Sequence, residues 1–404
     1  MEIKELTKKE FDDFIQSAQN TSLYQTSAYG MAMENQNYRP IYVGLFNGGT
    51  IVAGTLILIT DRGGFDYGYC PRGFIIDYND FELVEIWTKE LKRFLSKYNL
   101  IAIKLCPLIE KSTFNYDKIF DHMKRLDYYH FGYNYYFEAL KPRYEAVINL
   151  DTSLESLFFN IKKEYRTKIR AAANRGVKIY KGDHEDLIIL HNQTRKKYVR
   201  DLKYFNDLYL FFGDANSINI YYAKLNTGLY LNSIKNEFEA EEEKNDRLNR
   251  MVLQNMSNNL NLVGKKMDSD KKFSELKTKL IEATNLNSQK PDGSNIASGL
   301  VVTHKDEAYL MIDGLDTTYK SFNGKHLLIW KLIEKYHKLG YKKFNLGGMT
   351  RPDLEGNKFE GLNSFKLAFN AEVKEYMGDL ELIINNAKYN LFVKSNRISG
   401  ILKR

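Results

Sequence analysis

The sequence has few cysteines and no long apolar run, and each absence excludes a class of protein. Its two cysteines, Cys70 and Cys106, form no CxxC pair and no His/Cys cluster, so we expect no zinc site and no other metal. Residues 1–5 are charged and lack the apolar segment of a secretory signal. No stretch approaches the roughly 18 apolar residues that span a bilayer. We therefore expect a cytoplasmic protein with at most a peripheral membrane contact.

Familiar catalytic motifs are missing as well. We find no GxSxG, no P-loop, no HExxH and no GxGxxG after a strand. The (Arg/Gln)-x-x-Gly-x-(Gly/Ala) loop, with which acetyltransferases bind the coenzyme A pyrophosphate, is also absent. The sequence thus predicts no cofactor, and an acyl donor other than coenzyme A.

Length and charge indicate what is present. A chain of 404 residues is too long for one ordinary core, which favours two domains. The formal net charge of +8 favours an anionic partner, although it also serves solubility. Tyrosine is abundant, with 29 residues, and suits a polar groove because it buries a ring while offering a hydroxyl.

One pattern of strands and helix occurs twice along the chain. The first copy comprises strands at 41–46 and 51–59 around an Asn-Gly-Gly turn, a helix at 81–98 and a strand at 100–105. The second copy comprises strands at 218–225 and 296–302, a helix at 327–339 and a strand at 344–346. The two tryptophans, Trp87 and Trp330, fall at matching places in the two helices. We predict two related α/β domains with mixed, partly antiparallel sheets.

The repeat also locates an insertion. The second copy separates its first two strands by the charged residues 226–295, which carry apolar residues near helical spacing. We interpret residues 232–290 as an antiparallel two-helix coiled-coil arm with a thin apolar seam. A disordered charged linker is the alternative. The predicted domains are 1–150, completed by about 376–404, and 151–375, which contains the arm.

The densest basic cluster lies at residues 162–181, where eight Lys or Arg face only Glu164. Lys162, Arg166 and Arg170 recur every four residues and would line one face of a helix that ends near Arg175. Such a row suits a phosphate backbone. A solvated amphipathic helix explains the pattern equally well.

Three shorter features could also carry chemistry. Arg200 and Tyr204 are four apart and would share a helix face with donors for a phosphate or carboxylate. Gly347 and Gly348 follow a strand and would let a substrate approach the backbone. Lys366 adjoins aromatic rings near the C-terminus. Each feature also has a simpler explanation. Arg200 and Tyr204 could be a surface pair, the two glycines a plain turn, and Lys366 an ordinary surface lysine.

Together these segments resemble the Fem family of peptidoglycan interpeptide-bridge transferases, and most closely its FemA-like members of the lipid II glycyltransferase type. The resemblance covers essentially the whole chain and depends on the order and spacing of its motifs. These motifs are 24–29 (YQTSAY), 71–78 (PRGFIIDY), 174–178 (NRGVK), 344–348 (FNLGG), 361–366 (GLNSFK) and 370–379 (NAEVKEYMGD).

The resemblance implies two tandem acetyltransferase-like (GNAT-like) domains, an aminoacyl-tRNA donor and a muropeptide acceptor that is lipid-linked, as in lipid II, or UDP-linked. It implies that Arg200 and Tyr204 grip the phosphates of the precursor. It further implies that Phe365 and Lys366 lie at the reacting centre, where Lys366 steadies an oxyanion. Two positions depart from the pattern: Met33 replaces a Lys of some relatives, and Cys106 replaces an Asp of many.

We therefore expect an aminoacyltransferase that moves glycine, serine or alanine from tRNA to a peptidoglycan precursor. Three other interpretations are open on sequence alone. The first is a non-catalytic RNA-binding protein. The second is a tRNA-dependent transferase with another acceptor, such as a lipid headgroup or a protein N-terminus. The third is a self-protection enzyme of the same family.

Overall fold

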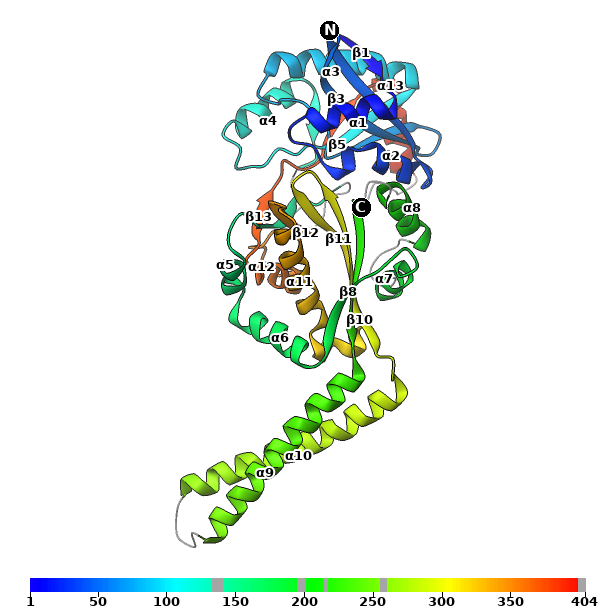
Figure 1. Cartoon of the computed structure of the whole chain (residues 1–404). Helices are drawn as coiled ribbons and strands as arrows, with labels where there is room; N and C mark the ends of the chain where they lie inside the picture. The colour runs from blue at the N-terminus through cyan, green and yellow to red at the C-terminus, as the bar shows by residue number, and fades with distance from the viewer. Residues whose placement is uncertain (133–140, 195–200, 214–216, 255–259, 399–404) are drawn as a thin grey trace.

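Two α/β domains are stacked one above the other, and a helical arm extends from the lower one (Figure 1). The computed structural model describes residues 1–132, 141–194, 201–213, 217–254 and 260–398. Over those ranges each domain is built on a seven-stranded sheet. The predicted mixed α/β class with two sheets is confirmed.

The first sheet, as far as the chain is described, has the order β1-β2-β3-β4-β5-β14-β6. All its neighbours are antiparallel except β4 and β5. The strands are β1 (Glu2–Glu5), β2 (Arg39–Asn47), β3 (Thr50–Asp61), β4 (Asp66–Pro71), β5 (Leu100–Cys106), β14 (Leu380–Ile383) and β6 (Tyr128–His130).

The second sheet repeats this arrangement in the order β8-β9-β10-β11-β12-β7-β13. Its single parallel pair is β11 with β12, the counterpart of β4 with β5. The strands are β8 (Val177–Lys181), β9 (Ile218–Leu225), β10 (Ser294–His304), β11 (Glu307–Leu315), β12 (Lys343–Met349), β7 (Tyr144–Asn149) and β13 (Glu372–Glu375).

The two sheets exchange one strand each. β7 precedes the second domain in the chain, yet it pairs with β12 and β13 of the second sheet. β14 follows the second domain in the chain, yet it lies between β5 and β6 of the first sheet. The boundary that we expected at residue 150 is therefore wrong by one strand. The apolar run of β7 (Tyr144–Asn149) reads equally well as the end of one sheet or the start of another.

Helices cover the sheets and make the crossovers between their parallel strands. α3 joins β4 to β5, and α11 joins β11 to β12, with Trp87 and Trp330 buried in them as the repeat predicts. The helices outside the arm are α1 (Lys8–Ser17), α2 (Ser27–Glu34), α3 (Phe81–Leu95), α4 (Tyr116–Arg125), α5 (Leu154–Asn160), α6 (Lys163–Asn174), α7 (Leu187–Thr194), α8 (Leu202–Gly213), α11 (Gly324–Lys338), α12 (Glu360–Leu367) and α13 (Asn386–Ile398). Short 3₁₀ turns lie at Leu23–Gln25, Ser96–Tyr98 and Thr317–Phe322.

The arm consists of α9 (Thr227–Gln254) and α10 (Leu260–Gln289), which leave the second sheet after β9 and return to it at β10 (Figure 1). Its seam contains polar contacts that we did not expect. Glu241 accepts a hydrogen bond from Ser269 at 2.7 Å and pairs with Lys272 at 2.9 Å. Phe238 stacks on Phe273 with ring centroids 5.0 Å apart. Among the described helices, these long ones included, none is sufficiently long and apolar to cross a membrane.

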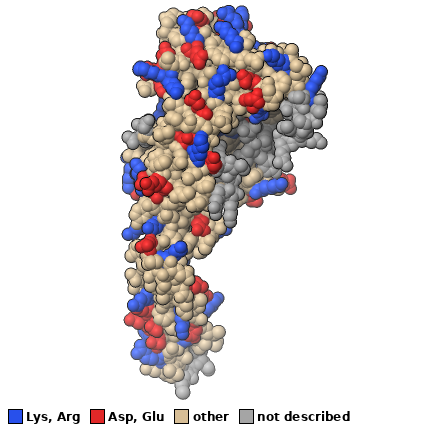
Figure 2. Space-filling view, turned by 90° about the vertical axis from the view of Figure 1, so that its right-hand side faces the viewer, with Lys and Arg blue, Asp and Glu red and all other residues tan. Residues whose placement is uncertain are grey.

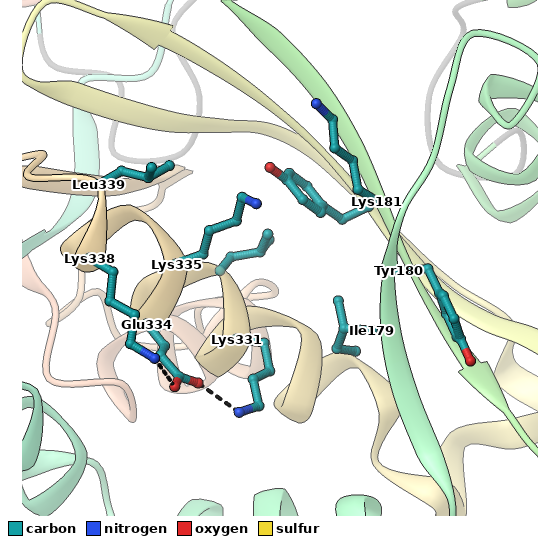
Figure 3. A pocket seen from close by; sticks show the side chains of 10 residues that line it. Ile179, Tyr180, Lys181, Lys331, Glu334, Lys335, Lys338 and Leu339 are labelled. Carbon is teal, nitrogen blue, oxygen red and sulfur yellow. Dashed lines mark hydrogen bonds and ion pairs between the residues drawn. The ribbon is translucent and has the colours of Figure 1, made fainter.

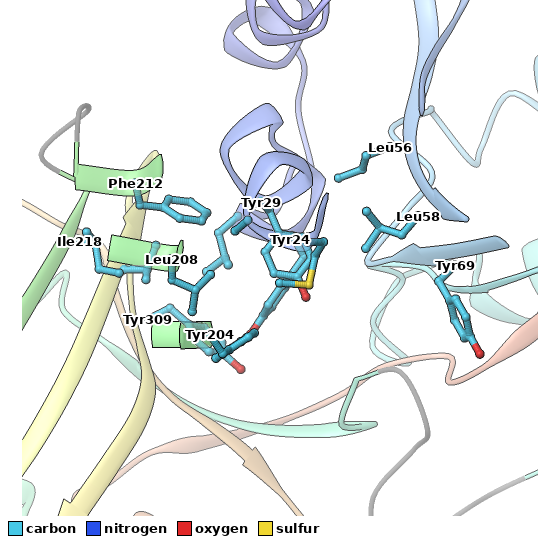
Figure 4. Close-up of a cluster of buried hydrophobic side chains, with 14 of the residues drawn as sticks. Tyr24, Tyr29, Leu56, Leu58, Tyr69, Tyr204, Leu208, Phe212, Ile218 and Tyr309 are labelled. Atoms are coloured by element: carbon cyan, nitrogen blue, oxygen red, sulfur yellow. The ribbon is translucent and has the colours of Figure 1, made fainter. Parts of the chain in front are cut away.

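The domains meet through an apolar core that contains residues of both. Figure 4 shows Tyr24, Tyr29 and Leu56 of the first domain beside Leu208 and Phe212 of the second. Because such a shared core excludes water from the seam, it holds the two domains in one orientation. Polar groups buried in this seam therefore need partners within the protein.

An ion pair between Arg72 and Glu145 crosses this seam. Arg72 follows β4 of the first domain, Glu145 lies in β7 of the second sheet, and their charged groups are 2.7 Å apart. Both side chains are almost fully buried, at 2% and 4% exposure. Arg72 also donates to the Pro142 carbonyl at 2.8 Å and lies over the ring of Tyr376. The pair thus ties two domains and a C-terminal segment together.

Glu145→Ala leaves the Arg72 charge buried without its carboxylate, so we expect it to lower the free energy of unfolding by about 3–5 kcal/mol. Urea denaturation followed by circular dichroism measures this change. The matched control is Asp66→Ala, which removes the carboxylate partner of the exposed Arg39. The control is expected to cost less than about 1 kcal/mol. Equal losses in the two variants would contradict the structural role of the buried pair.

Candidate active site

The parallel strands β11 and β12 separate partway along their length. They pair at Glu307–Lys343, Ala308–Phe344 and Tyr309–Asn345, after which the ladder ends. Gly347 has φ +78°, a left-handed conformation that suits glycine, and its N–H donates to the Asn345 side chain at 2.8 Å. The bend turns the end of β12 away from β11 and opens a wedge between the strands.

Lys366 of α12 occupies this wedge. Its Nζ donates to the Gly348 carbonyl at 2.6 Å, and its side chain is buried at 7% residue exposure. A Cβ at Gly347 would lie 3.8 Å from the same Nζ, so the glycine pair and the lysine share one site. Burial lowers the pKa of Lys366 from 10.5 to about 8, with the charge of Lys325 adding to the shift and Asp313 opposing it. The lysine is thus an ammonium group at neutral pH that is close to titrating.

Charged and aromatic groups from other elements surround Lys366. Lys325, in the first turn of α11, pairs with Asp313 of β11. Its Nζ lies 4.6 Å from the ring centroid of Phe365, the neighbour of Lys366 on α12. The His326 ring packs against Phe365 at 5.4 Å, and burial lowers the His326 pKa to about 4. The site therefore places the Lys325–Asp313 ion pair against the Phe365 ring, next to the buried ammonium group of Lys366.

The predicted basic row lies on α6 and at its first turn, next to α12. The backbone N–H of Lys162 donates to the Ala368 carbonyl at 2.9 Å, which joins the start of α6 to the end of α12. Lys162 and Arg170 are exposed and Arg166 is half-buried. Arg175, at the C-cap, donates to the Ser321 carbonyl at 3.3 Å. The row thus faces solvent while its helix borders the Lys366 site.

Tyr204 does not share this site. It is 6% exposed and belongs to the buried core between the domains, near Tyr24 and Tyr309 (Figure 4). The surface pair that was the alternative for these two residues does not hold for Tyr204, because the apolar side of α8 turns it into the seam. Arg200 itself lies outside the described residues. A role for either residue in binding the precursor stays a prediction.

A second polar cluster lies where β11 and β12 still pair. Asn345 donates to Glu145 at 2.9 Å and to Glu307 at 2.8 Å. Burial and the Glu145 charge raise the pKa of Glu307 to about 7, whereas Arg72 and its other hydrogen-bond donors hold the pKa of Glu145 below its usual value despite burial. Glu307 lines a cleft of about 570 Å³ together with Lys343, whose charge opposes the shift.

A basic groove of about 400 Å³ lies between the free edge of β8 and α11. Figure 3 shows three lysines of α11 on one side and Lys181 of β8 on the other, with Glu334 bonded to Lys331 and Lys338. By contrast, the face in Figure 2 mixes cations and anions over both domains and the arm. Among the described residues, no group of three His, Cys, Asp or Glu is placed to hold a metal ion.

Sequence reasoning missed Lys325, Asp313, Glu307 and Glu145. They come from three elements, α11, β11 and β7, and carry no local motif, so only the folded chain brings them together. One weak signal existed for Lys325. It follows Gly324, where a Cβ would lie 2.5 Å from Ile296, and such a glycine at the start of a helix marks a close approach to the sheet.

With this geometry in view, comparison with known proteins identifies the fold. The chain superposes on the crystal structure of FemX with a TM-score of 0.76 and 19% sequence identity, over 97% of this chain and 99% of the other. The chain therefore shares its overall fold with FemX.

The sequence then identifies the family. Residues 6–395 match the FemAB family, and the chain belongs to it. It is 24% identical to "Aminoacyltransferase FemA" of Staphylococcus epidermidis, over 97% of this chain and 98% of that protein. It is 26% identical to "Aminoacyltransferase FemB" of the same species over both full lengths. It is 24% identical to "Lipid II:glycine glycyltransferase" of Staphylococcus haemolyticus, over 97% and 95%.

The lowered pKa of Lys366 predicts a dependence of stability on pH. Between pH 8 and 10.5 the unfolded chain binds more protons at this lysine than the folded chain, so wild-type stability rises with pH there. The variant Lys366→Met lacks this rise in stability, because methionine does not bind a proton. We expect its stability relative to wild type to fall by about 2 kcal/mol between pH 7 and pH 10.

Urea midpoints of both proteins at the two pH values measure this change. The exposed Lys358 provides the control, because Lys358→Met should keep the same offset from wild type at both pH values. A constant offset for Lys366→Met would show that its ammonium group is not buried.

Proposed function

We propose that this protein transfers an aminoacyl group from aminoacyl-tRNA to an amine of a peptidoglycan precursor peptide, building an interpeptide bridge. The observation that carries the proposal is the buried ammonium group of Lys366, held between the separating strands β11 and β12 beside a row of exposed cations. Relatives that align over the whole chain are named aminoacyltransferases, and one is named a lipid II:glycine glycyltransferase. A protein that only bound RNA would have no use for a buried cation in a dry wedge.

The reaction joins an amine to an ester that is already activated, so it requires no ATP. The neutral amine of the stem peptide or growing bridge attacks the ester carbonyl carbon. A C–N bond forms, the carbonyl oxygen becomes an oxyanion, and the C–O bond to the ribose then breaks. The amine proton leaves through water or the substrate, and the ribose regains its hydroxyl. The protein has to align the two substrates and stabilise the oxyanion.

Lys366 is suited to that stabilisation. Its ammonium group has three N–H donors, of which the Gly348 carbonyl occupies one. A cation positioned in a water-poor site gains more from a developing negative charge than it would in water. We assign the surrounding groups to positioning: Lys325 and Phe365 shape the wedge, and Gly347 and Gly348 allow the substrates to approach it.

The substrates determine where the protein acts. A precursor that carries lipid or UDP is made on the inner side of the membrane, so we propose a cytoplasmic protein that touches the membrane only peripherally. Glycine, serine and alanine are the candidate donors, and lipid-linked and UDP-linked peptides are the candidate acceptors. A reconstituted reaction with each charged tRNA and each acceptor, read by product mass, selects among them.

In that reaction, Lys366→Met is expected to lower turnover at least about 100-fold, corresponding to about 3 kcal/mol of lost transition-state stabilisation. Circular dichroism verifies that the variant is folded. Lys358→Met serves as the control because it removes an exposed lysine near the same helix without touching the wedge.

Full turnover by Lys366→Met would remove this lysine from the mechanism. Binding of tRNA by the wild type without any discharge of the amino acid would instead favour the RNA-binding interpretation. If the amino acid appeared on a lipid headgroup or a protein N-terminus, and not on a precursor, the proposed acceptor would be wrong.

The pKa of Lys366 also predicts how turnover depends on pH. Only the protonated form stabilises an oxyanion, so its contribution is complete well below pH 8 and is lost as pH rises through about 8. Lys366→Arg keeps its charge over this range. We expect the ratio of wild-type to Lys366→Arg turnover to fall about tenfold per pH unit above pH 8. The ratio cancels the rising deprotonation of the acceptor amine, and a flat ratio would contradict the role.

A further inference from the structure

An exposed aromatic ring marks the corner between α5 and α6. α5 ends at Asn160 and α6 begins at Lys163, and Phe159, in the last turn of α5, is 73% exposed. Its neighbour Phe158 packs against Trp330 with ring centroids 4.8 Å apart, which anchors the corner to α11. A single exposed ring is ordinary on a protein surface, so its surroundings decide whether it binds anything.

Two arginines of α6 hold these rings. The Arg166 guanidinium lies 5.2 Å from the Phe159 ring centroid and donates to the Phe159 carbonyl at 2.8 Å. Arg170, one turn further along, lies 5.2 Å from the Phe158 ring centroid. The rings and cations therefore form an ordered surface, with the Phe159 ring largely exposed to solvent.

The charge at this corner selects an anionic occupant. The exposed Lys162 and Lys163 add to the two arginines, and the one acidic side chain of α6, Glu164, is paired with Lys168. A flat aromatic face beside a row of cations has the two features that bind single-stranded nucleic acid, because bases stack on the ring while phosphates meet the cations. An anionic membrane would use the charge but not the flat face.

The corner also lies next to the candidate active site. The Tyr165 ring is 5.8 Å from that of Phe365, and the Lys162 N–H bonds to the Ala368 carbonyl just beyond α12. The corner is therefore joined directly to α12, the helix that carries Lys366.

We propose that Phe159, supported by Arg166, stacks an unpaired base of the single-stranded end of the donor RNA while Lys162 and Arg170 bind its phosphates. This rests on the proposed function and names the part of the RNA that is recognised. Stacking on Phe159 and phosphate binding by the cations are separate contributions to RNA affinity. Phosphate binding weakens as the salt concentration rises, whereas stacking depends little on salt.

The test measures binding of an uncharged RNA hairpin with a four-nucleotide 3′ tail that contains 2-aminopurine, at several salt concentrations. Phe159→Ala and Phe159→Leu should each weaken binding by about 5- to 100-fold and abolish the quenching of 2-aminopurine, with an unchanged salt slope. Phe159→Trp should retain binding. Arg170→Gln should reduce the salt slope by about 0.7–0.9. Phe114→Ala, which removes an exposed ring of the first domain, is the control.

Several results would overturn the proposal. The first two are wild-type affinity for the RNA in Phe159→Ala and an equal loss of affinity in Phe114→Ala. The third is equal binding of a blunt hairpin that lacks the tail. The fourth is that Phe159→Ala loses binding to phosphatidylserine vesicles while it keeps binding to the RNA. Failure of this inference is distinct from failure of the proposed function. If wild type transfers amino acids from tRNA while Phe159→Ala does so equally well, only the stacking site is wrong. If wild type neither binds RNA nor transfers, the donor itself is wrong.

Discussion

The structure depends on the buried ion pair between Arg72 and Glu145. Two charges removed from water must satisfy each other, so the loop after β4 and the strand β7 keep one relative position. Glu145 also accepts from Asn345, whose side-chain oxygen in turn binds the N–H of Gly347 at the bend of β12. The same chain of contacts therefore joins the two domains and shapes the wedge that contains Lys366.

That wedge explains how a lysine can be buried between two strands of the second sheet. Parallel strands that separate create a gap in which backbone groups lose their ladder partners. Here the Lys366 ammonium group fills the gap and bonds to the Gly348 carbonyl. Burial in that position lowers the lysine pKa. The chain that contains this arrangement belongs to the FemAB family and shares its fold with FemX.

Sequence reasoning succeeded where the signal was local and failed where it was not. The hairpins and the crossover helices with Trp87 and Trp330 were readable because periodicity and turn residues lie within one segment. The role that the resemblance gives to Lys366 stays a prediction. The Arg72–Glu145 pair spans 73 positions and leaves no periodic trace. The burial of Tyr204 could not be predicted, because tertiary packing decides which face of a short helix is covered. For the same reason, the sheet to which β7 belongs is decided only by its partners.

The exchange of β7 and β14 has a consequence for synthesis on the ribosome. The first sheet needs β14, at Leu380–Ile383, between β5 and β6, and this strand follows every other described strand in the chain. Until it emerges, the backbone groups of β5 on that side have no strand partner and form an open edge that can pair with other chains. The first sheet is thus completed only after β13, the last strand of the second sheet, has been made, which reverses the usual vectorial order of folding.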